Sequence, residues 1–547
     1  MKKSLVALSA AAMVAGLGFA GAAHAIVISD VAPGGANTAV ARAGIADAAA
    51  VAPVQNGGVG HIMFTPYFST ANGNTTLLSI VNTDKTYGKA VKVRFRGAAN
   101  SDDILDFTVL MSPGDVWTAS VEQGSDGISR LVSPDSTCVL PWQLTGKEGN
   151  DNKFRTFRLD QKLSAAALAE HTQEGYVEYL NMADILPNSA VFKAIKHVNN
   201  VAPCTESVMA MLMSTDPVTS ADASGLAGAD GVLRYGLSSP TGNLFGNWSI
   251  FNNNNITSYG GGHATVQAVV NAAASPLVNG AGRLFFSPQS DEAAPAAMLT
   301  VPATANTADP LLTSGVLKGL WLDLPDLSTP YVTTDASAAV RADNLSAALG
   351  SSGVMNEFVA TVPGAGVPFA TDWVFSQPTR RYHAAVGYTG AGNSMTSNTA
   401  VYRAGSTYYT AENMLMSHNR TSVKGTNVGS FLCTDGTFSG FNREEGNAVG
   451  DLSPAPSFGI CGEVATLTFN NAPSTVLNAS LTNRLVTVKQ GLANRVTVEA
   501  GWATATLNAP AANAAKVMPV VGYSATSFAN GQTKGNFGDA IAHRYKR

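Results

Sequence analysis

The stretch Lys89–Arg96, with the sequence KAVKVRFR, decides the fold class of this chain. Apolar and basic side chains alternate along it: Val91, Val93 and Phe95 point one way, and Lys92, Arg94 and Arg96 the other. A period of two is typical of an antiparallel β-strand that has one face in the core and the other in water. We therefore expect a half-buried strand whose three cations face solvent.

The segments around this strand carry the same pattern. Thr75–Asn82 is expected to be a strand, and Phe107 with Val109 continues the alternation after a polar loop. The segment SPGD at 112–115 places Pro and Gly at the two central positions of a tight turn, and Val116–Val121 follows as the return strand. Several short strands separated by turns predict a β-sandwich.

The rest of the chain continues this pattern with helical interruptions. Further strands are expected at 175–180, 247–251, 372–375, 464–470 and 484–500, and short helices at 163–170, 189–198 and 336–349. The expected fold class is mainly β, with antiparallel β-sandwich domains and short helical insertions. Gly260–Gly262 is expected to be a flexible surface loop. Ser79–Asn82 (SIVN) resembles Ser249–Asn252 (SIFN), but four positions do not establish a repeat.

Residues 1–25 have the build of a secretory signal peptide. Lys2 and Lys3 precede the apolar stretch Leu5–Ala20, and Ala23–Ala25 is a small-x-small cleavage site. We expect export by a Sec-type signal to the cell surface, the extracellular space or the periplasm.

Four segments are expected along the chain. They are the signal peptide at 1–25, a low-complexity segment at 26–60, a β-sandwich-type domain with helical insertions at 61–384, and a second β-rich domain at 385–547. The Ala/Val/Gly-rich segment 26–60 is a candidate surface tether, or alternatively a strand donated to a neighbouring molecule.

The composition limits the partners of this chain. Charged residues are only 13% of the sequence and the formal net charge is −4, whereas charged residues are about 25% of an average soluble domain. No basic stripe could neutralise phosphates, so we expect no nucleic-acid partner. No apolar run after the leader reaches the ~20 residues of a membrane-spanning helix, so we expect no transmembrane segment. A weakly charged surface repels neighbouring copies little, which suits dense packing.

The four cysteines predict disulfides, because an exported chain meets an oxidising environment. The sequence allows three pairings. We favour Cys138–Cys204 and Cys433–Cys461, since each half of the chain then has its own cross-link. Neither pair has the CxxC spacing of a redox or zinc site.

One acidic group is a candidate metal site. Asp102, Asp103 and Asp106 form the densest set of carboxylates, and hard carboxylate oxygens around a loop are ligands that calcium prefers. Calcium is the one cofactor that we consider. Asp residues at loop ends are also common because they form turns. Asp323 with Asp326 is a second pair of this kind.

The sequence has no GxSxG, HExxH, P-loop or EF-hand motif, so we do not expect an enzyme. The histidines after the leader are too widely spaced for a local metal motif, and we expect isolated hydrogen-bonded side chains. They are His61, His171, His197, His263, His383, His418 and His543. Trp117, Trp248, Trp321 and Trp373 could stack on sugar rings, but we expect them in the core, which one aromatic per strand usually fills.

Several short phrases resemble one protein group. They are Ile80–Asp84 (IVNTD), Val91–Arg96 (VKVRFR), Leu110–Trp117 (LMSPGDVW), Glu174–Glu178 (EGYVE) and Thr371–Phe375 (TDWVF). Together they resemble large exported cell-surface proteins of Gram-negative bacteria, some of them surface-layer-like, over most of 66–381. The resemblance implies surface location and a β-rich fold, and it carries over no catalytic residue.

These features lead to one functional hypothesis and two alternatives. We expect an exported structural cell-surface protein, a surface-layer subunit that self-assembles through repeated heterologous contacts. Its partners would be further copies of itself and outer-membrane surface glycans. The first alternative is a secreted adhesin or glycan-binding protein that uses exposed aromatics and Asn-rich loops such as Asn252–Asn255. The second is an exported hydrolase with a scattered active site.

Overall fold

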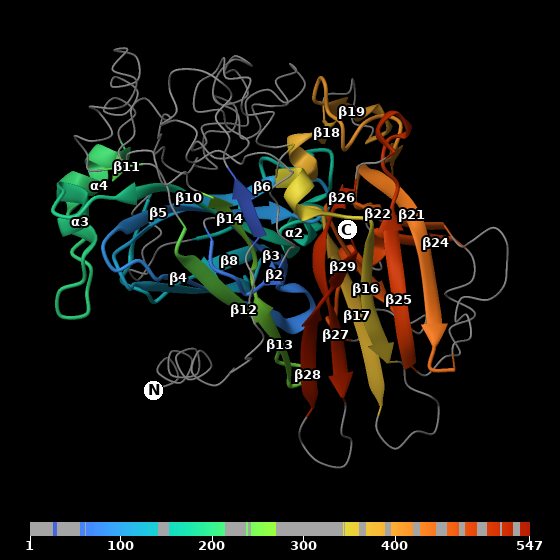
Figure 1. Ribbon diagram of the computed structural model, residues 1–547, viewed down its shortest axis with the longest axis horizontal. Coiled ribbons are helices and arrows are strands. Elements are labelled where there is room, and N and C mark those ends of the chain that lie inside the picture. The colour runs from blue at the N-terminus through green and yellow to red at the C-terminus, as the bar shows by residue number, and fades with distance from the viewer. Residues whose placement is uncertain are drawn as a thin grey trace.

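The structure of the 547-residue chain is a computed structural model. It describes residues 26–29, 55–60, 62–140, 152–213, 237–238, 242–269, 343, 345–359, 368–388, 395–418, 427–444, 457–469, 476–489, 500–514, 517–528 and 536–546. The predicted signal peptide at 1–25 lies outside these residues, as does most of the segment 26–60. The described chain is mainly β, with antiparallel sheets and few short helices, as expected (Figure 1).

The first half of the chain forms a β-sandwich. Its large sheet has the order β1 (Ile26–Ser29), β14 (Ala264–Val269), β3 (Ile62–Ser69), β10 (Glu174–Ile185), β5 (Gly88–Gly97), β6 (Asp103–Met111) and β9 (Cys138–Leu140), with β2 (Gln55–Asn56) and β11 (Leu237–Ser238) added at β14 and β10. Its small sheet has the order β13 (Thr257–Gly262), β12 (Leu244–Asn252), β4 (Asn74–Asn82), β7 (Val116–Gln123) and β8 (Ser129–Val132). Apolar side chains of the two sheets meet between them, as where the rings of Phe107 and Trp117 lie 5.6 Å apart.

The second half forms another sandwich. Its large sheet has the order β24 (Val486–Lys489), β22 (Ser457–Cys461), β21 (Phe431–Asn442), β25 (Ala500–Leu507), β16 (Gly353–Val359) and β29 (Arg544–Lys546), with β20 (Met414–Ser417) added at β21. Its small sheet has the order β23 (Val464–Thr468), β17 (Phe369–Ser376), β27 (Val521–Phe528) and β28 (Phe537–Ala542). Two short pairs flank it: β15 (Gly350–Ser351) with β26 (Met518–Pro519), and β18 (Ala384–Gly387) with β19 (Thr399–Tyr402).

Ten strands of the second sandwich repeat ten strands of the first, in the same chain order and the same sheet order. The corresponding pairs are β3 and β16, β4 and β17, β5 and β21, β6 and β22, β7 and β23, β9 and β24, β10 and β25, β12 and β27, β13 and β28, and β14 and β29. The chain therefore contains two copies of one antiparallel arrangement. The strand β8 has no counterpart among the described strands.

In each copy, a histidine occupies the position where the chain passes from one sheet of the sandwich to the other. His263 lies between β13 and β14, and His543 lies between β28 and β29. Each ring contacts a backbone carbonyl oxygen of the facing strand through Nε2, that of Ser79 at 3.0 Å and that of Val374 at 2.9 Å. Burial lowers the pKa of His263 to about 4 and that of His543 to about 3, so both rings are neutral in the folded protein.

A glycine of the neighbouring strand lies against each of these histidine rings. The backbone N–H of His263 donates to the carbonyl of Gly246, and that of His543 donates to the carbonyl of Gly522, both at 3.1 Å. A Cβ on Gly246 would lie 2.7 Å from the His263 ring, and one on Gly522 would lie 3.0 Å from the His543 ring. Any side chain at these positions would displace the ring, so the corner needs glycine.

Short helices fill the connections. They are α2 (Ala165–Glu170), α3 (Ala190–Ile195) and α4 (Glu206–Met213), and the 3₁₀ turns η3 (Ala71–Gly73), η7 (Arg380–Tyr382), η8 (Met395–Ser397), η9 (Thr482–Arg484) and η10 (Ala511–Asn513). The hydroxyls of Ser164 and Ser189 cap α2 and α3 by accepting backbone N–H bonds. The helices expected at 163–170 and 189–198 are thus present and shorter. Of the helix expected at 336–349, residues 343 and 345–349 are described and helical.

Both favoured disulfides are present, Cys138–Cys204 and Cys433–Cys461. The first ties the edge strand β9 to the segment before α4, and the second joins directly opposed residues of β21 and β22. Each sandwich therefore has one cross-link, as the pairing argument required.

Three expectations about the fold need correction or refinement. The division at 384 and 385 does not follow the sheets, because β16 and β17 pair with strands after it, and the two sandwiches divide between Val269 and Gly350. Gly260–Gly262 is not a loop but the end of β13, where the absence of side chains lets the Trp248 indole lie over the strand. Ser79–Asn82 and Ser249–Asn252 belong to β4 and β12, which pair with each other, so they are neighbours within one copy.

Acid should destabilise the fold through the two corner histidines. The unfolded chain takes up protons below about pH 6.5, whereas the folded rings stay neutral, so stability is lost as the pH falls from 6.5 towards 4. By about pH 4.5 the loss from His543 should be roughly 3 kcal/mol. Urea unfolding at pH 7 and pH 4.5 measures it. The variant His543→Gln should show a smaller difference in unfolding free energy between the two pH values than the unchanged protein does, and an equal difference would contradict the prediction.

Candidate functional site

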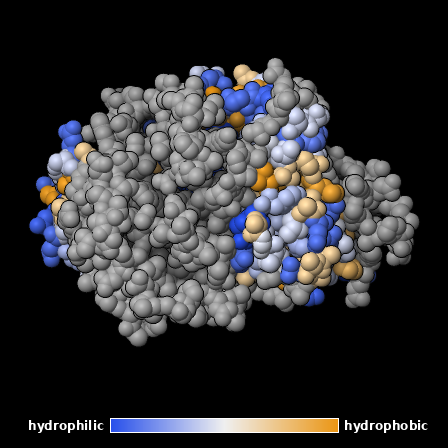
Figure 2. Space-filling view, turned by 90° about the horizontal axis from the view of Figure 1, so that it is seen from above, coloured by the Kyte–Doolittle hydropathy of each residue, from blue (hydrophilic) through white to orange (hydrophobic). Residues whose placement is uncertain are grey.

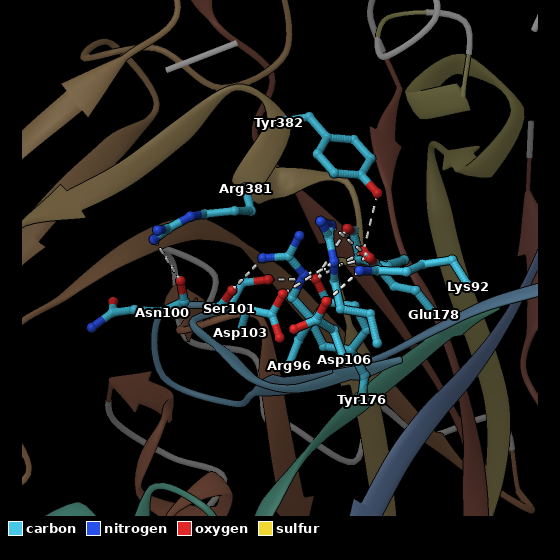
Figure 3. Close-up of polar contacts among 12 residues, drawn as sticks. Lys92, Arg96, Asn100, Ser101, Asp103, Asp106, Tyr176, Glu178, Arg381 and Tyr382 are labelled. Atoms are coloured by element: carbon cyan, nitrogen blue, oxygen red, sulfur yellow. Dashed lines mark hydrogen bonds and ion pairs between the residues drawn. The ribbon is translucent and has the colours of Figure 1, made fainter. Parts of the chain in front are cut away.

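The polar face of β5 carries a buried cluster of charges (Figure 3). Lys92, Arg94 and Arg96 are fully buried, so the expectation that they face solvent is wrong. The predicted alternation of side chains along β5 is confirmed, but both faces of this strand are buried. Carboxylates on the neighbouring strands β6 and β10 explain how the cations can be buried.

We define the ion cluster by its charged members. They are Lys92, Arg94, Arg96, Asp103, Asp106, Arg158 and Glu178. Lys92 pairs with Asp106, and Arg94 lies 3.3 Å from Asp103 and 3.4 Å from Glu178. Arg158 bridges the two aspartates at 3.0 and 3.3 Å. Each charge therefore has an opposite charge beside it, as burial requires.

Residues of the second sandwich complete this cluster. The Tyr382 hydroxyl donates to Glu178 at 3.1 Å, and Arg381 lies 3.5 Å from Asp102 and donates to the carbonyl of Asn100 at 3.0 Å. Figure 3 shows Arg381 and Tyr382 reaching the strands of the first sandwich from one side. The cluster is therefore a polar junction between the two sandwiches.

The structure brings the three candidate calcium ligands to this junction. Asp103 and Asp106 carry arginine and lysine partners, and Asp102 accepts from the Tyr388 hydroxyl at 2.5 Å besides its contact with Arg381. Calcium there would have to compete with these cations. Among the described residues no group of three or more His, Cys, Asp or Glu side chains is arranged to hold a metal ion. Calcium binding at these aspartates stays a prediction, and Asp323 and Asp326 lie outside the described residues.

A second buried carboxylate joins the sandwiches a short way along β10. Glu174 accepts the Tyr67 hydroxyl at 2.6 Å and the backbone N–H groups of Ser480 and Leu481. The hydroxyl of Thr482 donates to it at 2.9 Å. Burial raises the pKa of Glu174, and the hydrogen bonds that it accepts oppose this rise.

Ser–His–Asp groupings occur at two histidines of the described chain, His197 and His383. At His197, Ser136 Oγ lies 3.3 Å from Nε2 and Asp115 lies 3.9 Å from Nδ1, which is longer than the contacts of an activated triad.

The Ser346 Oγ lies 2.7 Å from His383 Nε2, and Asp343 lies 3.6 Å from His383 Nδ1. Arg403 sits at 3.0 Å from the same Nδ1 and can only donate to it, so the ring proton is on Nε2 and points at the serine. The Ser346 hydroxyl donates to Thr379 instead.

This arrangement fixes the serine and does not activate it. A nucleophilic serine needs an unprotonated histidine nitrogen to accept its proton. Burial and the Arg403 charge hold the pKa of His383 well below its usual range, and Ser346 is fully buried. The geometry therefore supports a structural role for these residues.

Most of the remaining candidates lie in the cores. Trp117, Trp248 and Trp373 are buried, as expected, and Trp321 lies outside the described residues together with His61. His171 is also buried, with Nε2 2.9 Å from the carbonyl oxygen of Val428. The expectation of hydrogen-bonded histidines is thus confirmed for six described residues, namely His171, His197, His263, His383, His418 and His543.

Sequence reasoning missed the most exposed tryptophan of the described chain. Trp502 is 43% exposed in the middle of β25 and stacks on Phe441, with ring centroids 4.6 Å apart. A signal was present in the stretch WATAT, where Trp502, Thr504 and Thr506 alternate with alanines that are small enough to face a tight core.

A scan against protein-family models, a search of curated proteins and a search of solved structures each give no match to this chain. Across the described residues, no helix has the length and apolar character needed to cross a membrane. The functional conclusion therefore depends on the chemistry of the chain itself.

Removing one charge from the ion cluster should strongly destabilise the protein. Glu178→Gln keeps the shape of the side chain but leaves Arg94 and Arg96 without their shared carboxylate, which costs about 3–5 kcal/mol for a buried pair. Urea unfolding measures the free energy of unfolding. The exposed control Glu122→Gln should change it by less than about 0.5 kcal/mol. Equal losses of unfolding free energy in the two variants would contradict the conclusion that the ion cluster stabilises the junction between the sandwiches.

The grouping around Ser346 should be chemically inert. A fluorophosphonate probe, which labels activated serines, should not label Ser346 in the folded protein, because this serine is buried and its histidine offers no free nitrogen as a base. Mass spectrometry after labelling checks this. Labelling that Ser346→Ala abolishes would show that the serine is nucleophilic after all.

Proposed function

We propose that this chain is an exported structural protein of the cell surface, a surface-layer-like subunit whose copies assemble side by side. The observation that carries the proposal is where the charges lie. Of the 34 basic and 38 acidic side chains, at least 19 are buried in the described part of the structure. The surface is thus poorer in charge than the composition indicates.

A weakly charged surface favours close packing of identical molecules. Identical copies always repel each other through their net charge, and charged side chains must be desolvated when two surfaces meet. In Figure 2 the coloured part of the face seen from above mixes hydrophilic, intermediate and hydrophobic residues, with no large area of one kind. Thr, Ser and Asn side chains can exchange hydrogen bonds with a neighbour at little desolvation cost.

The core supports the same proposal. One continuous cluster of buried apolar residues runs through both sandwiches, and the rings of Trp248 and Tyr523 meet across them at 4.4 Å. Two sandwiches with a shared core make one rigid unit, which a regular array needs. The two disulfides and the leader pattern support export, because disulfides persist in oxidising compartments.

Electron microscopy of the purified chain without its leader tests the proposal. We expect ordered sheets or tubes in negative stain, and sedimentation velocity should show large species that grow with protein concentration. Because few charges are involved, raising sodium chloride from about 50 to about 500 mM should change the assembled fraction little. Parallel samples with calcium and with a chelator show whether calcium bridges copies through acidic loops.

Dispersed monomers at high concentration, with and without calcium, would contradict self-assembly. Assembly that dissolves at high salt would contradict the argument from low surface charge, even if a layer forms. The variant Glu178→Gln serves as a folding control, since loss of assembly there reflects unfolding and not a lost contact.

A further inference from the structure

The outer face of the second large sheet presents a row of chemically distinct side chains. Glu357 on β16 is directly opposite Trp502 on β25, and Trp502 is opposite Phe441 on β21. The side chains of Glu357 and Trp502 are both exposed. A carboxylate, an indole and a phenyl ring therefore stand side by side across three neighbouring strands.

The indole in this row is held in one orientation. The planes of Trp502 and Phe441 are inclined by only 20°, so the phenyl ring supports one side of the indole. The neighbouring inward positions, Ala503 and Ala505, are buried, which fixes the strand beneath. A rigid aromatic loses little conformational entropy when a ligand binds to it.

Hydroxyl groups surround the row. Thr504 and Thr506 follow Trp502 along the same face of β25, and Thr437 and Ser439 precede Phe441 along β21. Their hydroxyls can donate and accept hydrogen bonds. At the next strand, β29, the exposed Arg544 and Lys546 add two positive charges. The face thus offers stacking, hydrogen bonding and charge.

We propose that this face binds the sugar rings of a polysaccharide, with Trp502 as the stacking platform. A pyranose has an apolar C–H face that fits an aromatic ring, and hydroxyls at its rim that fit Glu357 and the threonines. A flat sheet suits a long chain of sugars better than a single small molecule. Arg544 and Lys546 should favour chains that carry carboxylate or phosphate groups.

A second copy of this protein fits the face less well. The centre of a protein interface is usually depleted of charge, and an interface centred on Trp502 would bury the Glu357 carboxylate. Sugar hydroxyls would instead donate to that carboxylate. The inference goes beyond self-assembly and holds whether or not the copies form a layer.

Affinity electrophoresis with the full chain tests this proposal. The probes are polygalacturonate, its methyl ester, phosphomannan and amylose, which separate carboxylate, phosphate and neutral sugar chains. We expect retardation by at least one of them, with polygalacturonate binding more tightly than its methyl ester. Trp502→Ala should weaken binding by at least about tenfold, as for a central interface tryptophan, and Trp502→Phe should recover part of it.

Two further variants make the test specific. Phe537→Ala removes an aromatic that is 64% exposed on the other sheet of the sandwich, and it should bind as the unchanged protein does. The double variant Arg544→Gln/Lys546→Gln should abolish the preference for polygalacturonate over its ester. Thermal unfolding of Trp502→Ala confirms that the variant folds, and microscopy shows that its assembly is unaffected.

No retardation by any of the four probes would overturn the proposal. Equal binding by Trp502→Ala and the unchanged chain would also overturn it. Loss of assembly together with loss of binding in Trp502→Ala would show that the face is an interface between copies.

Discussion

Two buried carboxylates on one strand hold the two halves of this protein together. Glu174 and Glu178 both belong to β10, the strand next to β5 in the first large sheet. The first accepts backbone N–H groups at Ser480 and Leu481, and the second accepts the Tyr382 hydroxyl. A buried carboxylate is stable only when it is fully hydrogen-bonded or paired. The first sandwich can therefore bury β10 only with the second sandwich in place.

This dependence explains both the success and the failure of the pattern in Lys89–Arg96. The period of two correctly predicts a strand, because alternation reports which side chains share a face. It does not report what covers the second face, and polar residues at that face are expected in water by default. The cover here comes from Arg381 and Tyr382, almost 300 residues later in the chain. The sequence could have predicted a buried cluster only if β6 and β10 had been recognised as the neighbours of β5, because the carboxylates that pair with its cations lie on those two strands.

The same reasoning shows why the duplication is hidden in the sequence. Side-chain identity between the copies is needed only where backbone geometry is unusual, as at the corner where a histidine lies over a glycine. Strand positions need only an apolar residue of suitable size, so Ile80 and Phe375 can occupy equivalent places beside their glycines, Gly246 and Gly522. The antiparallel fold class, the local disulfides and the buried tryptophans were predictable because they depend on composition and short spacing. The boundary between the sandwiches was not, since β16 and β17 find their partners far along the chain.

The position of the charges connects this architecture with the proposed role at a surface. Charged side chains usually stay at the surface unless they are paired, whereas here many are buried and several of these form a junction between the sandwiches. The outer face of β25 and the end of β21 carry threonine, serine and two aromatics, which are side chains that can contact neighbours or sugars without strong desolvation. Glu357 is one of the charges that remain outside, and it stands beside the exposed Trp502. A charge kept next to an exposed aromatic, in a chain that buries so many others, points to a ligand that can satisfy both.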